Sequence, residues 1–282
     1  VLKSRVDECA PFENVYTLAL RGLHDRAMNA SNNMSDRKEM LQEALMAQRQ
    51  MLVDAIGKRA EDIPQAFTPY KEVLDVYDQG LELPDDVTII WPDDNYGYMK
   101  RLSSPKEQKR SGRSGVYYHS SYLGKPHDHL WMNTTSPTLM YEELRKAYDL
   151  TADRIWLLNA GDIKSCEFAV DYFLTMAFDI DSFNFERAAN YRTEWLCGML
   201  GNDYRNEYQD VINSFYKLAF ARKPEFMGWG YQWATDKHGR ERNTDTDFSL
   251  ANYREVDTRL AEYRRIGNMA EKILKALPED KK

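Results

Sequence analysis

A repeated three-part pattern constrains the fold of this chain more than any other feature. A short apolar run is followed by polar residues, and these are followed by a segment whose apolar residues recur at helical spacing. The pattern begins at four places, residues 15–25, 87–98, 115–130 and 154–164. Near-continuous apolar strands that alternate with helices predict a parallel sheet covered on both faces. Because crossovers between parallel strands are right-handed, the carboxyl ends of the strands should meet at one edge, where barrels build active sites.

Helical spacing marks the segments between these strands and changes character after residue 181. The predicted helices of the first part span residues 36–56, 69–79, 136–150 and 165–177. Ser136 and Pro137 form the start signal of the third helix. The second part has three long amphipathic patterns, at residues 185–200, 203–222 and 253–277. These are typical of a helical bundle. We therefore predict a partial (β/α) barrel domain over residues 1–180 and an all-α helical domain over residues 181–282.

Composition and charge exclude several classes of function. The 282-residue chain has a formal net charge of −7, and no Lys/Arg block dominates any segment, which argues against a nucleic-acid partner. Its densest basic stretch, residues 106–113, is expected to be a solvated loop. No apolar run approaches the roughly 18 residues that span a bilayer. The three cysteines, Cys9, Cys166 and Cys197, are far apart in the sequence and are expected to be buried thiols.

The first two strand ends carry carboxylates. Arg21 and Asp25 follow the first strand, and this pair either binds an acidic substrate or forms an internal ion pair that braces the loop. Asp93, Asp94 and Asn95 follow the second strand. If the chain stays extended there, Asp93 and Asn95 point one way and Asp94 the other. The alternative is that one of the three caps a helix N-terminus.

The last two strand ends carry an imidazole, a phenol and an amide. His119 and Tyr122 follow the third strand, and Asn159 ends the fourth, with Asp162 beyond it in a turn or helix start. His127 and His129 suggest a metal site, but no other cluster has metal-ligand spacing, so we predict none. Three aromatics, Trp229, Tyr231 and Trp233, could stack on sugar rings, although the preferred interpretation is a loop that packs its aromatics on the helical bundle.

These residue types suit an enzyme that handles sugars. Carboxylates, amides, His, Tyr and Arg at strand ends can bind a hydroxylated, anionic ligand, and glycoside hydrolysis needs a pair of carboxyl groups. The chain has no GxxxxGK[ST] or GxGxxG phosphate-binding motif and no GxSxG nucleophile elbow.

Three long runs carry a resemblance to a known family. The segments PDDVTIIWPDDNYGYMKRL, KRSGRSGVYYHSSYLGKPHDHLWMNTT and ADRIWLLNAGDIKSCEFAVDYFLTMAFD closely resemble glycoside hydrolase family 115, the xylan α-1,2-glucuronidases. The resemblance implies the C-terminal part of a TIM barrel followed by helices, and inverting release of (4-O-methyl) glucuronic acid from glucuronoxylan, without an organic cofactor. It implies Asp25 and Asp93 as catalytic carboxylates, and it assigns substrate binding to Arg21, Asn95, His119, Tyr122 and Asn159.

Family members are longer than this chain and place further strands and active-site residues before the region that matches. We therefore expect about half a barrel with an exposed sheet edge, and no hydrolysis of xylan by this chain alone. The family's substrate lies outside the cytoplasm, which implies a periplasmic or secreted protein. Three rival hypotheses remain: a uronate-binding or scaffold protein without catalysis, a metal-dependent hydrolase using His119, His127 and His129, and a helical interaction module in residues 181–282 that forms a homodimer.

Overall fold

The computed structural model describes residues 2–22, 26–28, 33–125, 127–130, 132–230 and 234–281. Helices and strands of the first half are α1 Leu2–Cys9, β1 Tyr16–Thr17, α2 Met34–Ile56, β2 Gln65–Phe67, α3 Glu72–Asp78, β3 Thr88–Pro92, the 3-10 turn η3 Glu107–Lys109 and β4 Ser114–His119. Those of the second half are α4 Pro137–Asp149, β5 Trp156–Asn159, α5 Ile163–Phe178, α6 Phe185–Leu200, α7 Arg205–Ala221, β6 Ala234–Thr235, β7 Glu241–Arg242 and α8 Glu255–Ala276.

The chain divides into two compact units, each of which is built from more than one segment. The first unit comprises Val1–Asp94, Met99–Tyr118 and Lys146–Leu157. The second unit comprises Asn95–Tyr98, His119–Arg145 and Leu158–Lys282.

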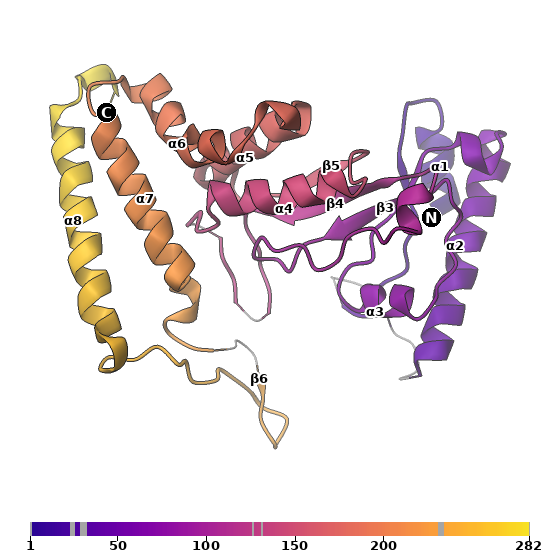
Figure 1. Ribbon diagram of the computed structural model, residues 1–282. Helices are drawn as coiled ribbons and strands as arrows, with labels where there is room; N and C mark the ends of the chain where they lie inside the picture. The colour runs from indigo at the N-terminus through magenta and orange to yellow at the C-terminus, as the bar shows by residue number, and fades with distance from the viewer. Residues whose placement is uncertain are drawn as a thin grey trace. The chain divides into compact units, whose positions relative to one another are not determined.

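A five-stranded sheet runs in the order β1-β2-β3-β4-β5, so each strand lies beside its neighbour in sequence. The first four strands pair in parallel, for example Ala66 with Thr88 and Ile89 with Ser114. Figure 1 shows β3 and β4 side by side. A sequential parallel order is that of a (β/α) barrel, whereas a doubly wound sheet reverses direction at a switch point. The predicted parallel α/β sheet is confirmed, and every residue of β3 is buried, as expected for strands covered on both faces.

Strand β5 approaches β4 so closely that β4 requires a glycine. Ser114 accepts a hydrogen bond from Arg154 N–H at 2.9 Å, and Val116 N–H donates to the Ile155 carbonyl at 2.9 Å. A Cβ added to Gly115 would collide with the Ile155 carbonyl oxygen and would lie 3.0 Å from Ile90 Cδ1. Glycine at this position therefore lets three strands pack at normal spacing.

Strand β2 has no counterpart among the predicted elements, because the sequence predicts only a helix from residue 69. The strand is only three residues long, and α3 begins at Glu72, three residues later than expected. A strand of this length gives no measurable alternation of apolar and polar residues. The sheet accordingly has a fifth carboxyl end, between those of β1 and β3.

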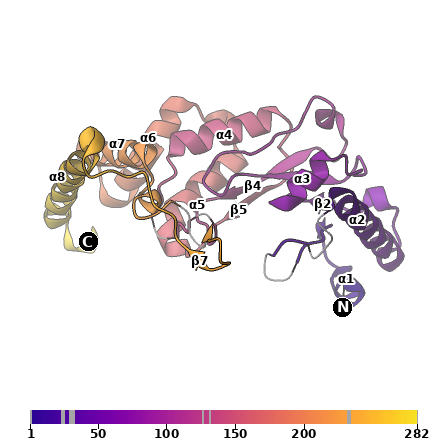
Figure 2. The ribbon, with the colours of Figure 1, turned by 90° about the horizontal axis from the view of Figure 1, so that it is seen from below.

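Helix α2 packs the first unit's core and matches its predicted span closely. It begins after the N-cap Asn33, whose side chain accepts from Ser35 N–H, and ends at Gly57, which has a left-handed φ of 73°. Leu41 and Leu45 on its inner face are fully buried with strand residues of the same core. Figure 2 shows α2 beside β2 and α3.

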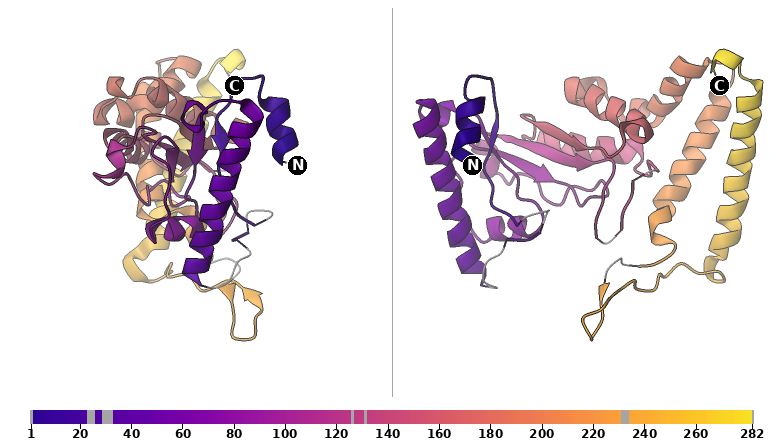
Figure 3. Two further views of the ribbon diagram at one scale, coloured as in Figure 1. Left: turned by 90° about the vertical axis from the view of Figure 1, so that its right-hand side faces the viewer. Right: turned by 180° about the vertical axis from the view of Figure 1, so that it is seen from behind.

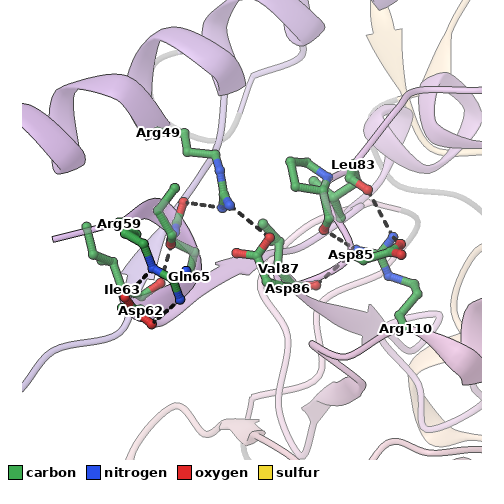
Figure 4. Close-up of polar contacts among 12 residues, drawn as sticks. Arg49, Arg59, Asp62, Ile63, Gln65, Leu83, Asp85, Asp86, Val87 and Arg110 are labelled. Carbon is green, nitrogen blue, oxygen red and sulfur yellow. Dashed lines mark hydrogen bonds and ion pairs between the residues drawn. The ribbon is translucent and has the colours of Figure 1, made fainter.

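Buried arginines brace the first unit's sheet (Figure 4). Arg49 of α2 donates to Gln65 Oε1 at 3.0 Å and to Asp86 Oδ1 at 2.8 Å, so it ties β2 to the segment before β3. Arg110 donates to the carbonyls of Leu83, Pro84 and Val87 at 3.0, 2.6 and 3.1 Å. The expectation of a solvated loop at residues 106–113 holds for Lys106 and Lys109, which are exposed, but not for Arg110, which lies over backbone carbonyls with only 10% of its side chain exposed.

In the second unit, aromatic side chains of α5 meet those of the following helix. Phe168 and Tyr172 stack with ring centroids 5.8 Å apart, and Tyr172 meets Phe183 and Tyr191 edge-on at 5.5 and 4.9 Å. The three helices predicted after residue 181 form as α6, α7 and α8, and α7 and α8 run side by side (Figure 3). The domain boundary at residue 180 stays a prediction. None of the described helices is long and apolar enough to cross a membrane.

Cysteine placement largely matches the expectation. Cys166 and Cys197 are buried, whereas Cys9 is half-buried, and all three are free thiols.

Candidate functional site

In the first unit, a bidentate ion pair joins the ends of β1 and β2. Arg21 lies four residues beyond β1, and Glu72 opens α3 beyond β2. The Arg21 Nε and NH2 groups donate to Glu72 Oε1 and Oε2 at 3.1 and 3.0 Å, and both side chains are less than one-fifth exposed. Glu72 Oε1 also accepts from Met28 N–H at 3.3 Å. Two parallel charge-assisted bonds fix the orientation of both groups.

The residues just before Glu72 add an aromatic face and a strained backbone. The guanidinium of Arg21 lies 5.4 Å from the Tyr70 ring centroid, and Lys71 Nζ lies 5.1 Å from it. Lys71 has φ 53° and ψ −123°, an unfavourable conformation for a residue with a Cβ. Backbone strain of this kind persists only where the surroundings enforce it, and it concentrates at functional sites.

Arg21 forms an internal ion pair with a residue that the sequence did not suggest, and its pairing with Asp25 stays a prediction. Arg21 pairs with Glu72, while Asp25 lies outside the described residues. Sequence reasoning missed Glu72 because it missed β2. The run QAF followed by Thr68 and Pro69, where the proline ends an apolar stretch, is the signal that could have located this strand end.

Asp93 follows β3 and is buried, with 1% of its surface exposed. Its N–H donates to the Tyr117 carbonyl at 3.1 Å, and it forms an antiparallel bridge with Met99. The helix-capping alternative for this segment is wrong, because no helix begins between β3 and η3 in this fully described stretch. A carboxyl group buried at a strand end instead suits a ligand site.

In the second unit, Asn95 adopts a left-handed conformation with φ 74°. The expectation that Asp93 and Asn95 point the same way depends on an extended chain. Because the backbone of Asn95 is left-handed and not extended, the alternation of side chains does not apply there. Asp93 is buried, whereas Asp94 and Asn95 are both half-buried. The carbonyl of Asn95 accepts a hydrogen bond from His129 Nε2 at 2.5 Å.

The structure brings His119, Tyr122 and Asn159 together, as the sequence predicted for neighbouring strand ends. His119 ends β4, is fully buried, and meets Tyr122 edge-on at 5.7 Å between ring centroids. Ser120, between them, donates from N–H and Oγ to the Asn159 carbonyl at 2.9 and 3.0 Å. Ser121 Oγ accepts from Gly161 N–H at 2.5 Å. Two serines therefore fix the end of β5 against the turn after β4.

The two histidines that suggested a metal contact different groups. His127 Nε2 bonds to the Gly230 carbonyl at 2.9 Å, and its ring stacks with Trp229 at 5.9 Å, whereas His129 engages Asn95. Within the described ranges, no group of three or more His, Cys, Asp or Glu residues could hold a metal ion. Trp229 is 36% exposed and stacks on His127 of the loop after β4, whereas Tyr231 and Trp233 lie outside the described residues, so the choice between sugar stacking and packing on the helices stays a prediction. Asp162 occupies the N-cap position of α5.

The two units carry different functional groups at their strand ends. The first unit holds a guanidinium, a paired carboxylate and a buried carboxyl group at the ends of β1, β2 and β3. The second unit holds an imidazole, a phenol and two amide side chains at the ends of β4 and β5 and just beyond β3. Carboxyl groups provide proton transfer, and the remaining groups provide hydrogen bonds to hydroxyls and pairing with an anion.

Comparison with solved structures shows a strong structural relationship. The chain is similar to BtGH115A, described as a novel family GH115 4-O-methyl-alpha-glucuronidase with specificity for decorated arabinogalactans, with 37% identity and a TM-score of 0.88. The match covers 99% of this chain and 36% of that chain, so this chain spans about a third of the relative's length. A second solved structure is an N-acetylneuraminate lyase from Proteus mirabilis, with 10% identity and a TM-score of 0.24. The match covers 94% of this chain and 91% of that chain, but the similarity is too low to indicate a shared fold or function.

Curated protein sequences gave no match. The family model described as glycosyl hydrolase family 115 matches residues 1–226, well over half of the sequence. On this match, together with the fold it shares with BtGH115A, the chain belongs to glycosyl hydrolase family 115.

Proposed function

We propose that this chain contributes to an α-glucuronidase that releases glucuronic acid, or its 4-O-methyl form, from a polysaccharide by inverting hydrolysis. Its family membership supports glycoside hydrolysis, and the activity stated for BtGH115A supports the uronic acid as the sugar released. A polymeric substrate of this kind favours a periplasmic or secreted protein.

One observation carries the proposal: a guanidinium and carboxyl groups follow three neighbouring parallel strands. Arg21, Glu72 and Asp93 lie beyond β1, β2 and β3, and Arg21 is held in bidentate contact with Glu72. In this proposal Arg21 binds the uronate carboxylate, because a guanidinium matches a carboxylate in geometry and charge.

The hydrolysis needs two carboxyl groups, one to protonate the leaving oxygen and one to activate water. Asp25 and Asp93 are the candidates from the sequence, and Glu72 joins them from the structure. Inversion requires the working pair to be roughly 6.5–9.5 Å apart, so that a water molecule fits between the carboxylate and the sugar.

Four further residues that the sequence predicted bind the sugar in this proposal. Asn95, His119, Tyr122 and Asn159 offer amide, imidazole and phenol groups to sugar hydroxyls. In this proposal, helices α6–α8 belong to a helical domain that starts at residue 181, and two copies of the protein associate through this domain.

The substrate is either glucuronoxylan or a decorated arabinogalactan. Glucuronoxylan follows from the family resemblance of the sequence, and the second from the specificity stated for BtGH115A. Uronic acid release from each polymer, measured side by side, decides between them.

The test compares Glu72→Gln and Asp93→Asn with the wild type and with Glu43→Gln, which removes an exposed carboxylate from α2. Because the chain spans 36% of BtGH115A, each variant is assayed alone and in a chain extended by the segments that the relative carries beyond it. Loss of a catalytic carboxyl group should lower kcat by about 10²–10⁴-fold, while Glu43→Gln stays at the wild-type rate.

Two outcomes would contradict the proposal. If the extended wild-type chain folds and binds glucuronic acid but releases none, the uronate-binding alternative replaces it. If both carboxyl variants keep full activity, the enzyme stands but Glu72 and Asp93 lose their assigned roles.

A further inference from the structure

Residues 95–98 belong to the second unit, although the residues on both sides of them belong to the first. The contacts that place them there come from the loop after β4. His129 Nε2 lies 2.5 Å from the Asn95 carbonyl oxygen, and its ring lies 5.0 Å from the Tyr96 ring. Tyr96 Oη donates to the His127 carbonyl at 2.5 Å and accepts from His127 N–H at 3.0 Å.

The partner of His129 defines which ring nitrogen carries a proton. A carbonyl oxygen only accepts hydrogen bonds, so Nε2 of His129 must be the donor. The residue that it holds has φ 74°, a left-handed backbone conformation that is unfavourable for residues with a Cβ, although Asn tolerates it better than most. The bond from His129 therefore acts on the backbone of a residue whose conformation needs support.

The same histidine also fixes Tyr122. Their backbones form an antiparallel bridge, in which each N–H donates to the other's carbonyl at 2.9 Å. The enclosed loop packs against the Tyr122 side chain, because a Cβ on Gly124 would collide with the Tyr122 hydroxyl. Gly124, with φ 153°, donates its N–H to Asp128 Oδ1 at 2.5 Å. Tyr122 is thus held from its backbone and from its ring.

We propose that His129 is a positioning residue that sets the candidate sugar-binding residues Asn95 and Tyr122 in one fixed arrangement. Its side chain holds the turn after β3, and its backbone holds the turn after β4. The bonds of His129 reach the Asn95 carbonyl and the Tyr122 backbone, so it acts through these two residues. The inference rests on the proposed function, in which Asn95 and Tyr122 bind the uronate-bearing sugar.

The test separates the hydrogen bond from the packing of the ring. His129→Phe keeps a flat ring beside Tyr96 but removes the donor, whereas His129→Gln keeps a donor nitrogen the same number of bonds from the backbone. His127→Phe is the matched control, since it removes an equivalent Nε2–carbonyl bond, to Gly230, from the same loop. The readouts are the Kd for glucuronic acid and the amide hydrogen exchange of residues 95–98, both on the full chain.

We expect His129→Phe to raise the Kd about ten-fold, which is the usual scale for one lost hydrogen bond, and to speed exchange across residues 95–98. His129→Gln should restore both to within about three-fold of wild type. His127→Phe should destabilise the protein to a similar degree but leave the Kd within about two-fold of wild type.

The inference is overturned if His129→Phe and His129→Gln behave alike, or if His127→Phe weakens binding as much as His129→Phe. Failure of the proposed function appears differently, as a wild type that releases no glucuronic acid or does not bind it. Hydrogen exchange then still decides the role of His129: unchanged exchange over residues 95–98 in His129→Phe refutes it, and faster exchange that Gln reverses supports it.

Discussion

Glu107 should contribute to stability in a way that depends on pH. Its carboxylate accepts two bonds from Arg101, at 2.9 and 3.1 Å, one from Ser104 N–H at 2.7 Å and one from Tyr77 Oη at 2.8 Å. Burial alone raises the pKa of this carboxyl group, but the hydrogen bonds from Arg101, Ser104 and Tyr77 outweigh it and lower the pKa from 4.5 to about 2. The side chain is 11% exposed, so solvent screens these bonds only weakly.

The depressed pKa sets the size of the effect. A fall from 4.5 to about 2 corresponds to roughly 3 kcal/mol in the free energy of unfolding, as an upper limit. The variant Glu107→Gln keeps the shape of the side chain but removes its charge and turns an amide group toward Arg101. We expect it to lose about 2–3 kcal/mol at pH 7.

The sign of the pH dependence follows from the direction of the shift. Because the folded-state pKa lies below the unfolded one, the stabilisation is complete above pH 4.5 and disappears as the pH falls toward about 2. The difference between wild type and Glu107→Gln should therefore be constant from pH 7 to 5 and shrink below pH 4.5.

Urea unfolding followed by tryptophan fluorescence measures this difference, since Arg101 lies over the Trp91 ring at 4.4 Å. Glu43→Gln, on the exposed face of α2, is the control and should change the free energy by less than about 0.5 kcal/mol. A Glu107→Gln loss that is the same at pH 3 as at pH 7 would refute the reasoning, as would a loss at pH 7 no larger than the control's.

Two further predictions test the packing of the first unit. Gly115→Ala should destabilise the protein by about 1–3 kcal/mol, because the added Cβ would collide with the Ile155 carbonyl. The control Gly198→Ala lies in open space on α6 and should be neutral or stabilising. Thermal unfolding compares the two variants, and equal melting temperatures would contradict the prediction. Arg49→Met should lower the free energy of unfolding in urea by about 2–4 kcal/mol, because it leaves Asp86 without its counter-ion. The double variant Arg49→Met/Asp86→Asn should recover part of this stability. If it recovers none, the ion pair is not the cause.

The strand ends show how far the sequence determines the site. The apolar runs that became β3, β4 and β5 were readable because each strand spans at least four residues. The polar residues at their ends, including Asp93, His119 and Asn159, were found for that reason. Strand β2 has three residues and was invisible, and Glu72 was missed with it. The resemblance to family 115 predicted the same site residues as the strand-end pattern, because both depend on the same local motifs.

Tertiary structure decided which of these residues are partners. Arg21 pairs with Glu72, 51 positions away, and His129 holds Asn95, 34 positions away. Local patterns carry no information on such pairs, because they depend on strand order and on the path of the loops between strands. The left-handed turn at Asn95 also overrode the alternation expected of an extended chain. The sequence by itself thus determined the element types, the parallel sheet and the chemistry available at its ends, because these depend on residues close together in the chain. Only the packed structure decided which side chains meet, because those contacts join residues that are distant in the chain.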